Sequence, residues 1–464
     1  MSSPSDDVQE RTQRFAIALC RRIGDRKVID DRDLLEEYAG DESHVEPRMP
    51  DLAVRARSRE DVLAVLELAA EHGVPITPRG GGTGKVGGAI AAAGGAVLDL
   101  TRLNDIREIS CEDLVAVVEP GVVLGELQAA VEDEGLFYPP DPNSLESCTI
   151  GGNAAHNAGG PRAFKYGVTR EYVLGAETAL LGGETLRSGR RTIKGVAGYD
   201  LTALLVGSEG TLGVFTELTL RLVRKPPALA TLLVRLPDEA TGARSVERIV
   251  AAGLIPRVLE FIDGKLVAVL REAGAGAVPE GTGALLLAEL DGLADEDVER
   301  DAIRLAELCE SQGADEVLMA RHGGEREQLW AARRVLSDAI KQRVRHKVAE
   351  DVVVPRSRAV ELLAGLRELE KKWGVELASY GHAGDGNYHV NILWNDDAFD
   401  PEPVVADVFA LTLSLDGTIT GEHGIGLAKR AYLPDELQAS LIEMQRRLKQ
   451  QFDPLGLMNP GKIF

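Results

Sequence analysis

The sequence contains few of the residues that mark several common protein classes. Its 464 residues include only four cysteines, Cys20, Cys111, Cys148 and Cys309, and no two of them form a CxxC pair. This spacing excludes a standard cysteine-ligated iron–sulfur cluster within the chain and argues against a disulfide scaffold. Lysine and arginine together number 52, against 74 aspartates and glutamates, which gives a net charge of −22. Nucleic-acid and anionic-membrane surfaces need clustered basic residues, so the charge argues against both.

Long apolar runs are also missing. No stretch of about 18 apolar residues occurs, so we expect no transmembrane helix. The first ten residues, MSSPSDDVQE, lack a basic segment followed by an apolar run. We therefore expect no signal peptide and a cytoplasmic protein. A chain of 464 residues exceeds one ordinary hydrophobic core, so two or three domains are expected.

The texture of the sequence changes twice along the chain. Residues 1–46 are polar and predict a helical arm, residues 47–226 are dense in glycine and short strand-like runs, and residues 227–464 have an α+β pattern. A first helix is expected over Ser58–Gly73, capped by Ser58 and ended by Gly73. Further on we expect strands at 231–236 and 283–290 and helices at 245–254, 294–312 and 434–452. The last helix places Leu437, Leu441, Met444 and Leu448 on one stripe.

A glycine-rich loop, PRGGGTGKVGG, spans residues 78–88. It contains a formal GxGxxG, but only about eight residues follow before the next strand, too few for the crossover of a dinucleotide-binding unit. A Walker loop is also excluded, because Val86 follows Lys85 where a hydroxyl is needed. Six glycines here let successive backbone N–H groups turn toward one anion, such as a pyrophosphate. A flexible turn remains the alternative.

A second group of motifs places histidines in glycine-rich loops. In SYGHAGDGNYHVNI, residues 379–392, a strand would put His389 and Asn391 on one face, and the GDGN turn can return His382 to it. Glu422, in GTITGEHGIG, offers a third ligand. Two imidazoles and a carboxylate suit Zn²⁺, Mn²⁺ or Fe²⁺, although the histidines could instead be hydrogen-bonded polar groups of a turn. His423 follows Glu422, and a histidine, with an ordinary pKa of about 6.5, suits a general base near neutrality.

Together these motifs carry a resemblance. PRGGGTG, PPDPNS, TIGGN, GYDLTALLVGSEGTLG, GHAGDGNYH and GEHGIG occur in family order from about residue 45 to the last residue. The chain resembles the FAD-binding oxidoreductases of the vanillyl-alcohol oxidase type. Within that family it resembles the branch of D-lactate dehydrogenase, the glycolate oxidase catalytic subunit and D-2-hydroxyglutarate dehydrogenase.

The resemblance implies the fold and the cofactor. It implies an α+β protein with a two-subdomain FAD-binding domain over residues 47–226. An α+β substrate cap and a C-terminal helical segment, carrying the metal site and the base, would occupy residues 227–464. Positions matching FAD contacts in the family are Arg79, Gly80, Gly81, Gly82, Thr83, Gly84, Pro142, Ser144, Thr149, Gly151, Gly152, Asn157, Gly159, Glu209, Gly213, Val214 and Asn459. The first loop contains no histidine, so we expect noncovalent FAD. For His156 in the second loop, flavin contact and a surface role both remain open.

The resemblance also implies the chemistry. His382, His389 and Glu422 match the family's metal ligands, and His423 matches the base that takes the C2 hydroxyl proton while hydride passes to flavin N5. Arg333 matches an arginine that grips the substrate carboxylate. In the alternative interpretation, Arg333 and Arg334 lie on a solvated helix face. Asn391 is expected to contact substrate. Lys347 lies one residue from a second carboxylate-binding lysine of the hydroxyglutarate branch, and Ser337 stands where that branch uses threonine. These departures favour D-lactate or glycolate.

The expected function is therefore FAD-dependent, metal-assisted oxidation of a small 2-hydroxy acid to the 2-oxo acid. Electrons would pass to an external acceptor: a quinone, a cytochrome, an electron-transfer flavoprotein or an iron–sulfur protein. A homodimer is compatible with the sequence. Four alternatives stay open: a D-2-hydroxyglutarate dehydrogenase, a noncatalytic FAD-binding subunit of an oxidase complex, a metal-dependent hydrolase using Glu422 and His423, and a non-redox flavin lyase or synthase.

Overall fold

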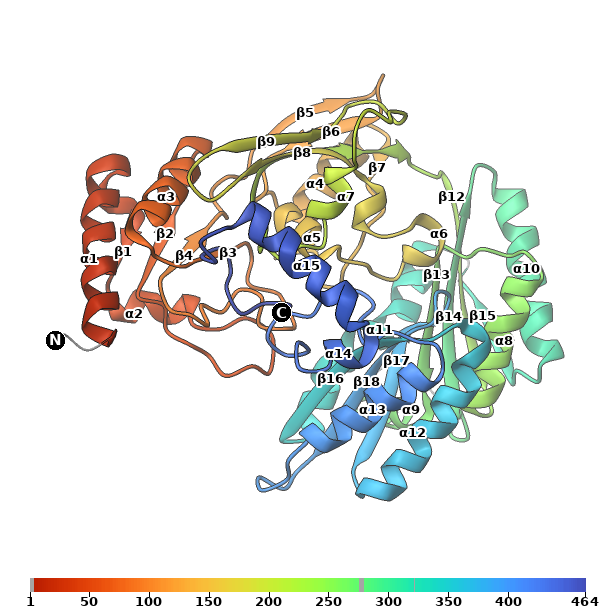
Figure 1. Ribbon diagram of the computed structural model, residues 1–464. Helices are drawn as coiled ribbons and strands as arrows, with labels where there is room; N and C mark the ends of the chain where they lie inside the picture. Colours follow the sequence, from red (N-terminus) through yellow and green to blue (C-terminus); the bar gives the residue numbers. More distant parts are fainter. Residues whose placement is uncertain (1–3, 275–278, 321) are drawn as a thin grey trace. The chain divides into compact units, whose positions relative to one another are not determined.

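The computed structural model describes residues 4–274, 279–320 and 322–464 (Figure 1). Backbone contacts divide the chain into two compact units. The first comprises Met1–Ala158, Val168–Lys225 and Glu422–Phe464, and the second comprises Gly159–Gly167 and Pro226–Gly421. Residues 422–464, which the sequence placed with the cap domain, therefore group with the first unit. No helix in the described part of the chain is both long enough and apolar enough to cross a membrane.

One sheet of the first unit is mostly parallel. Its strands, in spatial order, are β1 (Val28–Ile29), β2 (Leu52–Arg55), β4 (Ala96–Asp99) and β3 (Ile76–Arg79). Strands β2, β4 and β3 are parallel, and β1 is antiparallel to β2. The N-terminal helix α1 (Pro4–Ile23) packs on α3 (Arg59–His72), and its Phe15 and Leu19 are fully buried in the same core as β2. The N-terminal segment is thus an integral layer of this unit rather than a separate arm, because its apolar stripe is used for packing.

Helix α3 has the ends that its sequence predicts. The Ser58 side chain accepts a hydrogen bond from the Asp61 N–H, and Gly73 ends the helix with a left-handed φ of 66°. Both devices satisfy helix-end groups that would otherwise lack partners. The prediction for this helix is confirmed.

The second sheet of the first unit is antiparallel. Its spatial order is β5 (Ile106–Ser110), β6 (Val115–Val118), β10 (Val214–Arg221), β8 (Val173–Ala179) and β9 (Thr185–Gly189). A small ribbon pairs β11 (Val223–Arg224) with β7 (Leu136–Phe137). The helices between these strands are α4 (Leu124–Asp133), α5 (Ile150–His156) and α7 (Leu201–Leu205). The described residues also form the short helices α2 (Arg32–Leu35) and α6 (Ala163–Tyr166), and 3-10 turns at Asp25–Lys27, Glu36–Tyr38, Thr169–Glu171 and Arg356–Arg358.

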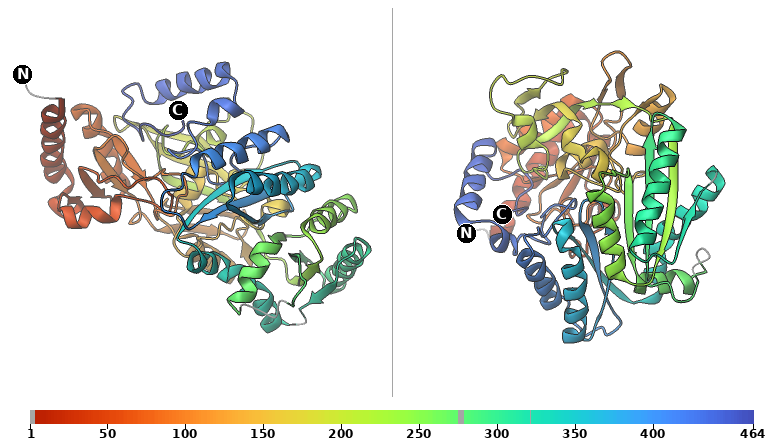
Figure 2. Two further views of the ribbon diagram at one scale, coloured as in Figure 1. Left: turned by 90° about the horizontal axis from the view of Figure 1, so that it is seen from below. Right: turned by 90° about the vertical axis from the view of Figure 1, so that its right-hand side faces the viewer.

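The second unit is built on one seven-stranded antiparallel sheet (Figures 1 and 2). Its spatial order is β15 (Glu316–Met319), β12 (Ala228–Leu236), β14 (Ala284–Gly292), β13 (Val258–Asp263), β17 (Glu376–His382), β18 (Asn387–Trp394) and β16 (His346–Val353). Its helices are α8 (Glu239–Ala251), α9 (Gly264–Glu272), α10 (Asp295–Ser311), α11 (Gly323–Arg343), α12 (Ala359–Trp373) and α13 (Glu402–Ser414). The predicted strands at 231–236 and 283–290 and the helix at 294–312 are confirmed.

Helices cover both faces of this sheet. Helices α9 and α11 bury Leu266 and Leu336 together with Ile262 and Ala378 of the strands. On the opposite face, Gly242 of α8 lies against the Phe261 ring. Helix α8 begins six residues before the predicted range of 245–254, because the Asp238 side chain caps it through the Thr241 N–H.

The C-terminal helix is interrupted. The structure has α14 (Leu433–Glu436) and α15 (Ala439–Phe452), with Leu437 and Gln438 extended between them, where one continuous helix was expected. Three residues of the predicted stripe, Leu441, Met444 and Leu448, are exposed, and Ile442 is buried instead. The prediction of one helix was wrong, because an extended backbone at two successive residues ends the i to i−4 hydrogen-bond pattern.

Candidate active site

Two glycine-rich segments meet in the first unit. A Cβ on Gly80 would overlap with the Thr149 hydroxyl, and one on Gly81 would overlap with the Ser147 carbonyl oxygen. Only glycine therefore lets the loop after β3 approach the start of α5 this closely. Thr149 itself caps α5 through the Gly152 N–H at 3.3 Å. The structure thus brings together expected FAD contacts from segments about seventy residues apart, and this glycine cradle fits the pyrophosphate of FAD.

A cavity of about 390 Å³ borders this loop at the carboxyl ends of the parallel strands. Its lining residues are Glu37, Tyr38, Arg55, Arg79, Gly80, Gly81, Asp99, Thr101 and Arg102. Ligands of open parallel sheets usually bind at this edge. The Arg79 guanidinium donates to the carbonyl oxygens of Gly40 at 2.7 Å and Glu37 at 3.1 Å. Arg79 therefore fastens the N-terminal segment over the end of the sheet.

Glu209 and Asn459 hold distant segments of the first unit. The Glu209 carboxylate accepts from the N–H groups of Ile425 at 2.7 Å and Gly426 at 2.8 Å. Asn459 donates from Nδ2 to the carbonyl oxygens of Gly88 at 3.1 Å and Glu209 at 2.7 Å. Both residues were expected as FAD contacts, and in the structure their side chains bind backbone groups of the chain itself.

The loop that carries His423 lies against the glycine loop within the first unit. The Leu427 N–H donates to the Val86 carbonyl oxygen at 2.8 Å. A Cβ on Gly424 would lie 3.3 Å from the His156 ring, and one on Gly88 would lie 2.8 Å from His156 Nε2. His156 is therefore packed between these two glycine segments rather than free on the surface. The candidate base and the candidate pyrophosphate loop belong to one compact unit.

The other expected FAD positions have varied surroundings. Val214 is buried in the apolar core of the first unit, and a Cβ on Gly213 or Gly151 would press on Thr178 or Pro120. Asn157 ends α5 with φ of 53° and accepts from the Arg170 N–H through Oδ1.

Gly159 begins the segment assigned to the second unit. Gly82 lies beside the Arg79 guanidinium, and Thr83, Gly84, Pro142 and Ser144 lie in loops without regular structure. The side chain of Val214 is therefore used for core packing.

The metal-ligand candidates of the second unit share one face of its sheet. Tyr380 of β17 pairs with His389 of β18, which pairs with Asp351 of β16. His382 of β17 pairs with Glu260 of β13. Directly opposed residues of antiparallel strands point to the same side, and residues two apart along a strand do as well. Register alone therefore gathers five polar or aromatic side chains on one face.

His382, His389 and Glu422 can converge on one metal ion. Their ligand atoms all lie within 4.8 Å of one another, and the two histidines are 2% and 4% exposed. Glu422 is the residue directly after Gly421, whose N–H is held by Asp351 of the second unit. His382 Nδ1 is hydrogen-bonded to Glu260, which leaves Nε2 as the nitrogen for a metal. The chemistry of two imidazoles and one carboxylate fits Zn²⁺, Mn²⁺ or Fe²⁺.

Glu260 links the candidate metal ligand His382 to Arg333, the expected substrate arginine. Its carboxylate is fully buried and accepts from His382 on one oxygen and from Arg333 Nε, at 2.7 Å, on the other. Burial alone would raise the pKa of Glu260, but the charges of His382 and Arg333 and their hydrogen bonds hold it well below its usual range. The Arg333 guanidinium also lies 4.5 Å from the Tyr380 ring centroid. Arg333 is 8% exposed and faces the sheet, so the solvated-face alternative is wrong.

Asn391 and Lys347 lie on the same face as His389. Asn391 donates from Nδ2 to the carbonyl oxygens of Ala378 at 3.1 Å and His389 at 3.0 Å. Its Oδ1 is buried and has no hydrogen-bond partner among the described residues. Lys347 pairs with Leu393, two residues beyond Asn391. The side chain of Ser337 lies outside the described part of the structure.

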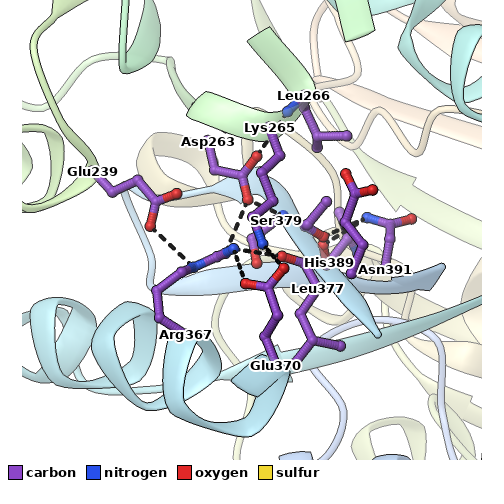
Figure 3. A network of polar contacts seen from close by, with 12 residues as sticks. Glu239, Asp263, Lys265, Leu266, Arg367, Glu370, Leu377, Ser379, His389 and Asn391 are labelled. Carbon is purple, nitrogen blue, oxygen red and sulfur yellow. Dashed lines mark hydrogen bonds and ion pairs between the residues drawn. The ribbon is translucent and has the colours of Figure 1, made fainter. Parts of the chain in front are cut away.

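The opposite face of the sheet fixes the strand that carries His382. Asp263 accepts from the Ser379 N–H at 2.6 Å and from Arg367 at 3.2 Å, and Arg367 also contacts Glu239 and Glu370 (Figure 3). Burial raises the pKa of Asp263 to about 7, and its hydrogen bonds and the Arg367 charge oppose that shift. This network ties β13, β17 and α12 together behind the candidate site.

Sequence reasoning missed three residues of the site: Glu260, Asp351 and Tyr380. The one available signal for Glu260 is a charged residue inside the apolar run VLEFI. A charge is rarely buried without a partner, so such a residue predicts an ion pair. The partners of Glu260 lie 73 and 122 residues away, and no local pattern identifies them.

Two family models match the chain: an FAD binding domain over residues 50–189 and the C-terminal domain of FAD linked oxidases over residues 225–463. The chain belongs to the FAD-linked oxidase family. It is 40% identical over 431 residues to the glycolate oxidase subunit GlcD of Bacillus subtilis, covering 92% of each chain. It is 36% identical to the D-lactate dehydrogenase of Anaerostipes hadrus, covering 96% of each chain. It is 35% identical to the D-2-hydroxyglutarate dehydrogenase of Stutzerimonas stutzeri, covering 94% of this chain and 96% of that one.

The expected fold is confirmed. A solved structure of p-cresol methylhydroxylase is similar, with a TM-score of 0.79 and 18% identity over 98% of this chain and 97% of that one. The chain therefore has the two-domain FAD-oxidase fold of the vanillyl-alcohol oxidase type. As a family member it is an FAD-linked oxidoreductase, with relatives named for hydroxy acids.

Proposed function

We propose that this flavoprotein oxidises a small 2-hydroxy acid to the 2-oxo acid with the help of a divalent metal ion. The observation that carries the proposal is the convergence of His382, His389 and Glu422, with His423 next to Glu422 in the chain. A metal-dependent hydrolase could use the same residues, but it would have no use for FAD.

Each residue of the site has a separate proposed role toward the substrate. Arg333 is the cation for the substrate carboxylate, since a guanidinium binds that group in a bidentate manner. Oδ1 of Asn391 is a buried acceptor without a described partner, so it needs a hydrogen-bond donor from the substrate. The C2 hydroxyl is such a donor, whereas the ionised carboxylate only accepts. His423 accepts the hydroxyl proton as general base. The metal, when bound, polarises the hydroxyl and carboxylate, and FAD accepts the C2 hydride.

D-lactate and glycolate are the proposed substrates, with D-2-hydroxyglutarate as the second candidate. Lys347 favours the second candidate in one respect, because register puts it on the face that carries Asn391. A second carboxylate would need a cation on that face. For reoxidation we propose an external acceptor, a quinone, a cytochrome, an electron-transfer flavoprotein or an iron–sulfur protein, because the four cysteines form no cluster motif.

Anaerobic flavin reduction tests this proposal. The purified protein is expected to be yellow and to bleach when D-lactate or glycolate is added without oxygen. The decay of the visible flavin absorbance would be recorded for glycolate, both lactate enantiomers and both 2-hydroxyglutarate enantiomers. Faster bleaching by D-2-hydroxyglutarate would select the second candidate. A yellow protein that none of these acids reduces would contradict the proposal, and a colourless one would favour the hydrolase.

A further inference from the structure

We propose that Asp351 is a positioning residue that holds two ligand-bearing segments of the metal site in register with each other. This assignment rests on the proposed metal site and deepens it. Asp351 lies in β16, is fully buried and stands directly opposite His389 in the sheet. It is not one of the three residues that form the cluster.

Each oxygen of Asp351 binds a different segment. Oδ1 accepts from Asn387 Nδ2 at 2.5 Å, and Asn387 precedes His389 by two residues on the same face of β18. Oδ2 accepts from Thr420 Oγ1 at 3.1 Å and from the Gly421 N–H at 2.9 Å. Gly421 directly precedes Glu422. One carboxylate therefore fixes the approach of a histidine ligand and of the carboxylate ligand.

The second segment has little freedom once these bonds form. Val353 and Thr418 exchange two backbone hydrogen bonds, at 3.1 and 2.9 Å, which hold the chain beside β16 three residues before Gly421. A Cβ on Gly421 would lie 2.6 Å from Asn387 Nδ2, so the two segments already touch. The Asp351 bonds therefore add an anchor directly before Glu422 to the one at Thr418.

A carboxylate is required because three donors converge on two oxygens. An asparagine has one acceptor oxygen and would turn an N–H toward either Asn387 or the Thr420–Gly421 pair. One of the two segments would then lose its hydrogen bond to residue 351. A buried donor without an acceptor destabilises that arrangement. Partners that orient metal ligands typically contribute on the order of 10- to 100-fold to metal affinity.

Zinc titration of the FAD-loaded, metal-stripped protein tests the assignment. Asp351→Asn is expected to weaken Zn²⁺ binding on the order of 10- to 100-fold relative to wild type. Its flavin absorbance spectrum should stay that of the wild type, because FAD retention depends on the first unit. Asp291→Asn is the matched control. Asp291 lies in β14 of the same sheet and is buried. In the described structure its carboxylate contacts Lys165, Tyr166 and Arg257.

The outcomes separate the assignment from the metal site. Two results would overturn the role of Asp351 alone. One is an Asp351→Asn variant that binds Zn²⁺ as tightly as wild type, and the other is an equal loss of Zn²⁺ affinity in Asp291→Asn. Wild-type protein that binds no Zn²⁺, Mn²⁺ or Fe²⁺ would overturn the metal site and the assignment with it. If Asp351→Asn does not fold, Thr420→Val removes a single donor to the same carboxylate. It should still weaken Zn²⁺ binding several-fold, and unchanged binding would overturn the assignment.

Discussion

Replacing His423 with alanine should abolish flavin bleaching by the hydroxy acid while leaving the protein yellow. The variant removes the only group proposed to take the C2 hydroxyl proton, and positioned general bases contribute roughly 10²- to 10⁴-fold to rate. FAD should be retained, because the Glu209 carboxylate and the Val86 carbonyl bind backbone N–H groups of this loop, which the substitution leaves in place. Stopped-flow absorbance under anaerobic conditions measures the effect.

His346→Ala is the matched control for that experiment. His346 begins β16, stacks on Trp394 and pairs with Asp397 near the surface, so its loss should leave the bleaching rate unchanged. Bleaching of His423→Ala at the wild-type rate would show that another group takes the proton. Loss of the yellow colour in His423→Ala would instead show that the loop is needed for FAD binding.

Glu260→Gln should weaken metal binding and destabilise the fold at the same time. The substitution removes the charge that pairs with Arg333, whose guanidinium stays buried. Breaking a buried pair from one side costs about 3–5 kcal/mol of unfolding free energy. A Gln amide has one acceptor oxygen where Glu260 uses one for Arg333 and one for His382, so it cannot accept from both in the present arrangement. If the amide N–H₂ faces His382, the tautomer that presents Nε2 is no longer fixed, so Zn²⁺ affinity should fall on the order of 10- to 100-fold. Urea unfolding and zinc titration measure the two effects.

Glu316→Gln provides the control for the loss of charge. Glu316 pairs with Arg235 in the same sheet but is 46% exposed, and surface pairs contribute about 0–1 kcal/mol. Its unfolding free energy and zinc affinity should match those of the wild type. Wild-type zinc affinity in Glu260→Gln would refute the link between the ion pair and the metal ligands.

Local signals in the sequence predicted much of the fold. Ser58 and Gly73 mark their helix because capping depends on residues within one turn. The break between α14 and α15 has no such mark: Leu437 and Gln438 are neither glycine nor proline, yet both are extended. The sequence therefore does not mark this boundary. Leu441, Met444 and Leu448, which amphipathic spacing placed on one stripe, are exposed.

The site shows the same division. His382 and His389 could be placed on one face because a hairpin and strand alternation relate them within eight residues. The residues that hydrogen-bond to the candidate ligands and their neighbours could not be predicted. Glu260 binds His382 across 122 residues of sequence, and Asp351 binds Gly421 across 70. The anchoring of the His423 loop by Glu209 spans 216 residues and was likewise invisible to spacing arguments.

Metal removal tests the central claim most directly. The FAD-loaded protein would be stripped with a chelator, its metal content checked by elemental analysis, and its anaerobic reduction by the best hydroxy acid timed before and after Zn²⁺, Mn²⁺ or Fe²⁺ is returned. Lewis-acid polarisation is worth several kcal/mol, so stripping should slow reduction by roughly 100-fold or more, and one of the ions should restore it. An unchanged rate in protein shown to contain no metal would contradict the claim that His382, His389 and Glu422 hold a functional ion.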